Sequence, residues 1–263
     1  MVLARRKFFQ HLPSLCLAGG FFVLLPAGAS VAEVEVGPGL RFESQQVYVR
    51  DAQGRYFQTN LQETLGTLCV RDNEGPWQAQ ITGAWADWNP SGDWQGSNFD
   101  QTALDTFYWE RQANVSASLV YEVWAGVSVG AGYADTSVRH YRGDDQFTYL
   151  QYRTRTLEAL LQYSLHPTCE LAFSATAAYA PYAVLEVHVN SNVPENYPAV
   201  HALDLAGGGT RWRGSLQGIY RFPWGLGVDL VYEQGFARFS APGPAEEVTL
   251  RFGRLSGYLV MAF

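Results

Sequence analysis

Residues 254–263 read RLSGYLVMAF, and every second residue from Leu255 to Phe263 is apolar or glycine. Alternation with a period of two predicts a β-strand whose two faces meet different surroundings. An alternating strand that ends in an aromatic residue resembles the signal read by the assembly machinery of bacterial outer membranes. This stretch therefore predicts an outer-membrane β-barrel, which requires further strands of the same kind along the chain.

The same alternation continues through most of the chain. Between Phe107 and Val123, one face is apolar and carries Trp109, Ala113, Val115, Ala117, Leu119 and Tyr121. The other face is polar and carries Glu110, Gln112, Asn114, Ser116 and Ser118. Apolar residues with aromatics near the strand ends are typical of a lipid-facing wall, and small or charged residues are typical of a lumen. A soluble sandwich would instead bury its apolar face and leave its polar face in water.

The alternating segments predict an all-β fold, a transmembrane antiparallel β-barrel of ten strands, with eight strands as the alternative if the region before Trp77 does not span. Tight connections at 72–75, 166–168 and 222–224 suit the periplasmic end, and the longer ones at 89–102, 190–202 and 240–245 suit the cell surface. The predicted strands are 34–50, 56–71, 76–88, 103–122, 126–142, 148–164, 169–188, 203–221, 226–239 and 246–263.

The N-terminal segment has the pattern of an export signal. Arg5, Arg6 and Lys7 precede an apolar run, and small residues follow, so that cleavage is expected after Ala29 or Ala32. We expect residues 1–32 to be a signal peptide and residues 33–263 to be the barrel domain. No later stretch is apolar for the roughly 18 residues of a membrane helix.

Charge and cysteine content exclude several classes of function. The chain has 18 basic and 25 acidic residues, and loss of Arg5, Arg6 and Lys7 would leave a net charge of −10. Nucleic acid is therefore not expected as a partner, because binding to phosphates needs a basic face. Cys69 and Cys169 are expected to be separate thiols, and neither they nor the few histidines have the spacing of metal ligands.

Several charged residues are candidates to fill the lumen of so narrow a barrel. Buried charges must be paired, so a packed polar network is expected in place of an open pore. The candidates are Glu110, Arg153, Arg155, Glu158, Arg211, Arg213, Asp229 and Glu233, and the register of each strand decides which of them face inward.

Two motifs resemble the omptins, outer-membrane endopeptidases built on a ten-stranded barrel. Residues 47–55 read VYVRDAQGR and are similar to the family's Val-Tyr, acidic, Gly-basic first turn. Residues 87–94 read DWNPSGDW and are similar to its Asp-Trp, Asn-Pro-Gly, Trp loop. The resemblance implies a peptidase site at the extracellular mouth, in which an Asp pair faces an Asp/His pair across a water molecule.

The resemblance carries over to this chain only in part. Asp87 stands where the second aspartate of the first pair would fall, with Trp85 two residues earlier and Asp93 as a nearby substitute. The family's Asp-x-His would fall at 190–195, which reads NSNVPE, so His201 with Asp204 is the remaining candidate pair. Either a shifted constellation works, or the barrel has lost protease activity.

Two functions therefore remain open. The first is a surface-exposed interaction or adhesin-type barrel with a degenerate protease site, and the second is an active omptin-type endopeptidase. The expected partners are membrane lipid, lipopolysaccharide and an extracellular peptide or protein, with Arg139 and Arg142 as candidate ligands of lipopolysaccharide phosphates. A monomer without a cofactor is expected, and a requirement for lipopolysaccharide is left open.

Overall fold

The computed structural model describes residues 33–51, 56–90, 93–97, 107–142, 149–189, 205–240 and 245–263. All of the regular structure in these ranges is β-strand. The predicted signal peptide lies outside the described residues. The strands are β1 (Glu33–Asp51), β2 (Tyr56–Glu74), β3 (Trp77–Pro90), β4 (Asp93–Ser97), β5 (Phe107–Trp124), β6 (Val127–Arg142), β7 (Tyr149–Leu165), β8 (Leu171–Val189), β9 (Leu205–Arg221), β10 (Leu226–Ser240) and β11 (Ala245–Ala262).

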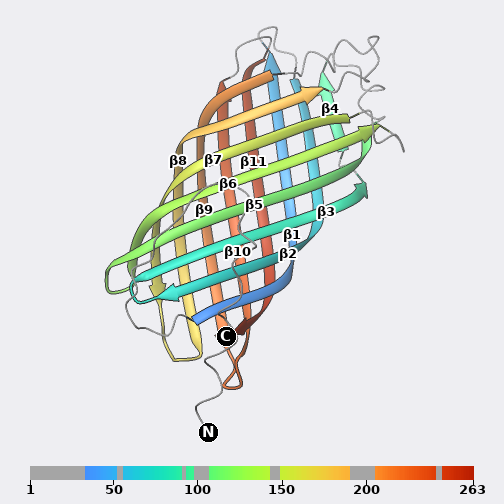
Figure 1. Ribbon diagram of the computed structural model, residues 1–263. Helices are drawn as coiled ribbons and strands as arrows, with labels where there is room; N and C mark the ends of the chain where they lie inside the picture. Colours follow the sequence, from blue (N-terminus) through green and yellow to red (C-terminus); the bar gives the residue numbers. More distant parts are fainter. Residues whose placement is uncertain are drawn as a thin grey trace, which may run out of the picture. The chain divides into compact units, whose positions relative to one another are not determined.

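The strands form one closed antiparallel barrel (Figure 1). Each long strand pairs with its neighbours in sequence, and β1 pairs with both β2 and β11, which closes the ring. Short β4 is not an additional strand of the ring. It pairs with the part of β2 that extends past β3. The prediction of a ten-stranded barrel is confirmed, and the alternative of eight strands is wrong because both β1 and β2 are full members of the wall.

Short connections close one end of the barrel, at the places predicted from the sequence. Gly75 and Gly225 have φ values of 56° and 89°, a conformation that side chains rarely adopt, so glycine is required at these turns. The amide of Phe222 donates a 2.7 Å hydrogen bond to the carbonyl of Leu226 across the β9–β10 turn. We call the opposite end of the barrel, where β1, β3, β6, β8 and β10 end, the outer end.

Side chains alternate between a lipid-type outer surface and a polar interior. The described residues include no helix long and apolar enough to cross a membrane. The outward face instead carries a continuous apolar surface, which we call the belt: Leu40, Phe42, Leu68, Ile81, Trp85, Val115, Val129, Tyr133, Leu157, Leu161, Phe173, Tyr182, Trp212, Leu216, Leu230, Tyr232, Leu255 and Leu259. A band of exposed apolar side chains around a closed barrel is what a bilayer requires of a spanning sheet.

The interior contains most of the charges that the sequence predicted for it. Glu110, Glu158, Arg211, Arg213, Asp229 and Glu233 are buried or half-buried on the inward face. The prediction is wrong for Arg153 and Arg155, which point outward because they alternate in step with Leu157 of the belt. Cys69 is buried, Cys169 is exposed at the β7–β8 turn, and both are free thiols, as expected.

Candidate functional site

The lumen near the short turns is closed by a cluster of charges centred on Arg71 of β2. Its guanidinium donates 2.8 Å hydrogen bonds to Glu35 of β1 and to Asp229 of β10. Arg221 of β9 donates a second bond to Glu35, at 2.7 Å, and Gln217 donates to Asp229 at 2.8 Å. Because each carboxylate receives at least two donors, their burial is compensated.

A second cluster fills the middle of the lumen. Arg213 of β9 bonds Glu158 of β7 at 2.6 Å and Glu233 of β10 at 2.7 Å. Arg254 of β11 bonds the other oxygen of Glu233 at 2.9 Å and Glu43 of β1 at 2.8 Å. A cavity of about 110 Å³ remains beside these groups. Charges from five strands are thus joined through the centre of the barrel, which leaves little space for a solute.

A third cluster lies toward the outer end and contains two buried carboxyl groups. Glu63 of β2 and Glu110 of β5 are 6% and 1% exposed. Nδ1 of His140 on β6 lies 3.3 Å from Oε2 of Glu110, and the rings of His140 and Tyr152 on β7 are 5.8 Å apart. We call these four residues the acid–imidazole cluster.

This cluster lies beyond the belt, in the part of the wall whose outward residues are polar. Glu63 stands between Gln62 and Thr64, which are exposed, and Arg139 precedes His140 on the outer surface. His140 is 0% exposed, so the imidazole and both carboxyl groups lie in the interior of the barrel, away from solvent.

Sequence analysis did not single out Glu63, His140 or Tyr152, because they come from three strands with no shared local motif. The sequence feature that these three residues share is their position in the alternation of inward and outward side chains. Each falls on the inward face of a strand whose apolar residues point outward. Such a signal places a residue in the lumen, but it does not show which residues of different strands meet there.

The outer surface just beyond the belt carries a row of charges, which we call the collar: Asp87, Arg111, Asp135, Arg139, Arg153, Arg155, Glu186, Arg238 and Arg251. Arg111 pairs with Asp87, Arg153 with Asp135 at 2.5 Å, and Arg155 with Glu186. Arg139 donates a 2.9 Å bond to Gln151 and stacks 5.2 Å from the ring centroid of Tyr149. On every strand that has a collar residue, that residue lies nearer the outer end than the belt residues of the same strand.

The predicted site residues are not brought together within the described part of the chain. The side chain of Asp87 is 64% exposed and pairs with Arg111, another collar residue. Arg139 is a collar residue too, and Arg142 lies at the last position of β6. Asp93 begins β4, but its side chain, like that of Arg142 and like the whole of His201 and Asp204, lies outside the described residues.

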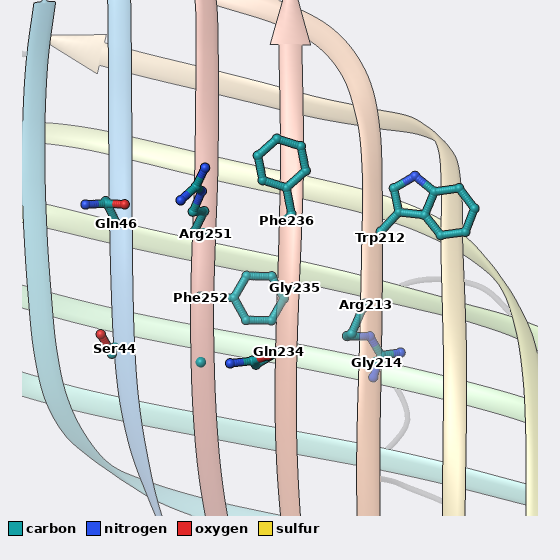
Figure 2. Close-up of a pocket in the computed structure, with 11 residues that line it drawn as sticks. Ser44, Gln46, Trp212, Arg213, Gly214, Gln234, Gly235, Phe236, Arg251 and Phe252 are labelled. Carbon is teal, nitrogen blue, oxygen red and sulfur yellow. The ribbon is translucent and has the colours of Figure 1, made fainter.

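A shallow groove crosses the outer wall over β9, β10, β11 and β1 (Figure 2). Its floor is formed by Gly214 and Gly253, at which a Cβ atom would meet open space. Arg251, Phe236 and Trp212 line it as one row of paired positions, and the open volume is about 960 Å³. The groove interrupts the upper edge of the belt.

The fold is also found among proteins of known structure. No protein-family model and no curated protein matches the chain. Among solved structures, it is similar to the outer membrane protease OmpT from Escherichia coli, with 7% identity and a TM-score of 0.56 over 88% of this chain and 96% of that one. The outer membrane protein OprG from Pseudomonas aeruginosa matches with 11% identity and a TM-score of 0.39 over 88% and 96% of the two chains. The translocator domain of the autotransporter NalP from Neisseria meningitidis matches with 8% identity and a TM-score of 0.41 over 89% and 90%.

The chain has the fold of bacterial outer-membrane β-barrel proteins. The closed antiparallel barrel with its apolar belt supports this statement. Identities of this size show the fold alone and do not show membership of the omptin family. In such barrels the short turns face the periplasm, so the outer end, with its collar and acid–imidazole cluster, faces the cell exterior.

Proposed function

We propose that this protein is a surface-exposed interaction barrel without proteolytic activity, in which the outer end presents binding loops and the filled lumen serves as a rigid support. The observation that carries the proposal is the pair of Asp87 with Arg111. A water-activating aspartate needs to face the mouth of the barrel and a histidine. Asp87 instead neutralises a neighbouring arginine in the exposed collar.

The packed lumen supports the same function. The ion pairs around Arg71 and Arg213 cross the interior at two levels, and a pocket of about 610 Å³ lies beside the short turns. A general diffusion channel requires a water-filled lumen. Contacts made at the outer end therefore fit this barrel better than passage through it.

The collar gives the second half of the proposal, which is an interaction with lipopolysaccharide. Arginine side chains bind phosphate with two parallel hydrogen bonds. Among the described residues, Arg139 has the neutral Gln151 and the ring of Tyr149 as partners, and neither is an acid. We propose that Arg139 and Arg142, the last residue of the same strand, bind phosphates of the outer leaflet.

A second candidate function is cleavage of peptides at the extracellular mouth by an Asp/His-activated water. Its support is the fold shared with an outer membrane protease over 88% of this chain. The residues that would act are Asp87, Asp93, His201 and Asp204. The two candidates make opposite predictions for one assay.

The test is cleavage of a panel of dibasic and other peptides by the refolded full barrel in lipopolysaccharide, beside an Asp87→Ala variant. We expect no cleavage by either protein. Cleavage by the wild type that is lost in Asp87→Ala would establish the peptidase instead. Cleavage that survives the substitution would also overturn the proposal, and would direct attention to other carboxylates.

The lipid part is tested separately, by thermal unfolding with purified lipopolysaccharide or with phosphatidylglycerol vesicles. We expect lipopolysaccharide to raise the Tm of the wild type, and an Arg139→Ala/Arg142→Ala variant to lose most of that increase. Equal stabilisation of the variant would remove these two residues from the proposal. Equal stabilisation of the wild type by phosphatidylglycerol would show a general response to anionic lipid.

A further inference from the structure

Arg41 of β1 is a buried arginine that makes no ion pair within the described part of the chain. It is 8% exposed, and its side chain points into the lumen in step with Glu43. Its Nε donates a 3.1 Å hydrogen bond to the hydroxyl group of Ser256 on β11, which is a neutral acceptor. A buried charge requires a counter-charge, and this bond does not provide one.

The cluster in the middle of the lumen, which Arg41 adjoins, has more positive than negative side chains. Arg254 and Glu43 are paired positions of β11 and β1, and Arg41 and Ser256 are the next inward pair of the same two strands. Among the described residues, the cluster contains four arginines against three glutamates, an excess of one positive charge: Arg41, Arg211, Arg213 and Arg254 against Glu43, Glu158 and Glu233.

The other interior acids do not neutralise this excess. Glu35 and Asp229 accept hydrogen bonds from Arg71 in the cluster near the short turns. Glu63 and Glu110 belong to the acid–imidazole cluster, and in the described ranges neither of them forms an ion pair with an arginine. The excess charge is therefore local to the middle of the lumen.

The cavity of about 110 Å³ lies against this excess charge and is lined by hydrogen-bond donors. All four arginines of the cluster line it. Nε of Arg211 and Nε of Arg254 are buried and have no acceptor among the described residues, since Nε of Arg211 lies 3.7 Å from the nearest oxygen of Glu158. Hydroxyl groups surround them, from Thr82, Ser116, Thr136, Thr176 and Ser215. Positive charge together with N–H and O–H donors is the environment that an anion requires.

The volume of the cavity limits the size of such an anion. One water molecule needs roughly 10–15 Å³ of a volume measured in this way, so about 110 Å³ accommodates a small ion with a few water molecules. Oδ1 of Asn114 is a buried acceptor without a donor on the same wall, and a water molecule beside the ion can donate to it. One negative charge is enough to balance the cluster.

The pocket beside the short turns provides a route to the cavity. This pocket of about 610 Å³ and the mid-lumen cavity share Gln162 and Gln217 as lining residues. The amide of Gln162 donates to Gln78 and Ser164, and that of Gln217 donates to Asp229. Rotation of these two neutral side chains breaks no ion pair, so a small solute can pass them from the periplasmic end.

We propose that the middle of the lumen binds one small monovalent anion, of the size of chloride or formate, which neutralises Arg41. The anion accepts hydrogen bonds from the guanidinium of Arg41 and from Nε of Arg211, and it enters from the periplasmic end. It completes a charge network that joins β1 to β9 and β11. The folded barrel binds this anion and the unfolded chain does not, so the anion stabilises the fold.

The experiment is equilibrium unfolding of the refolded full barrel in urea, with sodium chloride replacing sodium gluconate at constant ionic strength. Gluconate is also monovalent, but it is too large for the cavity. An anion that binds only the folded state lowers the unfolding equilibrium constant by the factor 1 + [L]/Kd. For the wild type, we expect a fall of about tenfold at about 100 mM chloride, which corresponds to a Kd of about 10 mM. Formate in place of chloride should give a fall of similar size.

Arg41→Gln removes the excess charge, and we expect its unfolding equilibrium constant to be the same in chloride and in gluconate. Arg251→Gln is the matched control. Arg251 also makes no ion pair within the described residues, but it is exposed on the outer wall, where its guanidinium lies over the ring of Phe236. We expect this variant to keep the chloride dependence of the wild type.

The proposal is overturned if the wild type unfolds equally in the two salts, or if Arg41→Gln keeps the chloride dependence. A second measurement does not depend on the folding of a variant. Wild-type crystals grown with bromide should show an anomalous scattering peak within hydrogen-bonding distance of the Arg41 guanidinium. Crystals without such a peak in the lumen would also overturn the proposal.

Discussion

Arg71 and Asp229 lie 158 residues apart in the chain and are joined by a 2.8 Å hydrogen bond inside the barrel. The guanidinium and the carboxylate are both about 1–2% exposed. Arg71 comes from β2 and Asp229 from β10, so the bond crosses the lumen and does not follow the wall. The same guanidinium holds Glu35 of β1, which makes Arg71 the centre of the lower cluster.

Removal of Arg71 alone should destabilise the barrel strongly. Arg71→Met would leave Asp229 without an ion pair in the lumen and Glu35 with Arg221 alone, at a cost of about 3–5 kcal/mol. Urea-induced unfolding in lipid vesicles, followed by tryptophan fluorescence, measures the loss. A variant that also carries Asp229→Asn should recover part of it, and no recovery would contradict the pairing.

Substitution of Gly235 tests how closely the middle of the lumen is packed. A Cβ atom at Gly235 would lie 2.1 Å from the ring of Phe252, which itself stacks between the guanidinium groups of Arg211 and Arg254 at 4.5 and 4.4 Å. We expect Gly235→Ala to cost about 1–3 kcal/mol. Gly214→Ala, on the neighbouring strand with open space around its Cβ, is the control and should cost less than half as much. Equal losses would show that strand propensity, and not the ring, is responsible.

The free-energy cost of introducing an arginine on the outer face should depend on how deep the position lies in the bilayer. Leu216 is 61% exposed within the belt, and Leu216→Arg should cost about 2–4 kcal/mol. Gln62 is exposed on the outer-end side of the belt, and Gln62→Arg should change the free energy of unfolding by less than about 1 kcal/mol. Folding titrations in vesicles measure both values. Similar costs at the two positions would mean that the belt has been placed at the wrong height.

Recordings in planar bilayers test whether the lumen is filled. The wild type should give no stable channel steps, because the Arg213, Glu233 and Arg254 side chains occupy the mid-lumen. An Arg213→Ser/Glu233→Ser/Arg254→Ser variant removes both signs of charge together and should conduct ions if it still folds. Large, regular steps from the wild-type protein would be incompatible with the packed interior.

The fold was predictable because the decisive information is local. Alternation along a single strand, as in Phe107–Val123, predicts which side chains face lipid without knowledge of the neighbouring strands. The belt residues follow this alternation. The same alternation was available for Arg153 and Arg155, which share a face with Leu157 and Leu161. Arg153 and Arg155 therefore belong to the outer face, and the register of β7 excludes them from the lumen.

The candidate site was much less predictable, since it depends on register between strands. Glu63, Glu110 and His140 meet only because β2, β5 and β6 are offset by definite amounts, and a bulge in β3 contributes to that offset. No local pattern encodes these offsets. The resemblance in the 87–94 loop directed attention to Asp87, which alternates in step with Trp85 of the belt and joins the collar.

The Arg71 cluster also bears on how this protein reaches its membrane. Glu35, Arg71 and Asp229 come from β1, β2 and β10. The three charges can therefore pair with one another only when the barrel closes. An open sheet that entered hydrocarbon early would carry a bare guanidinium with it. We therefore expect a high kinetic barrier to insertion of any partly assembled form, and strand closure to precede or accompany entry into the bilayer.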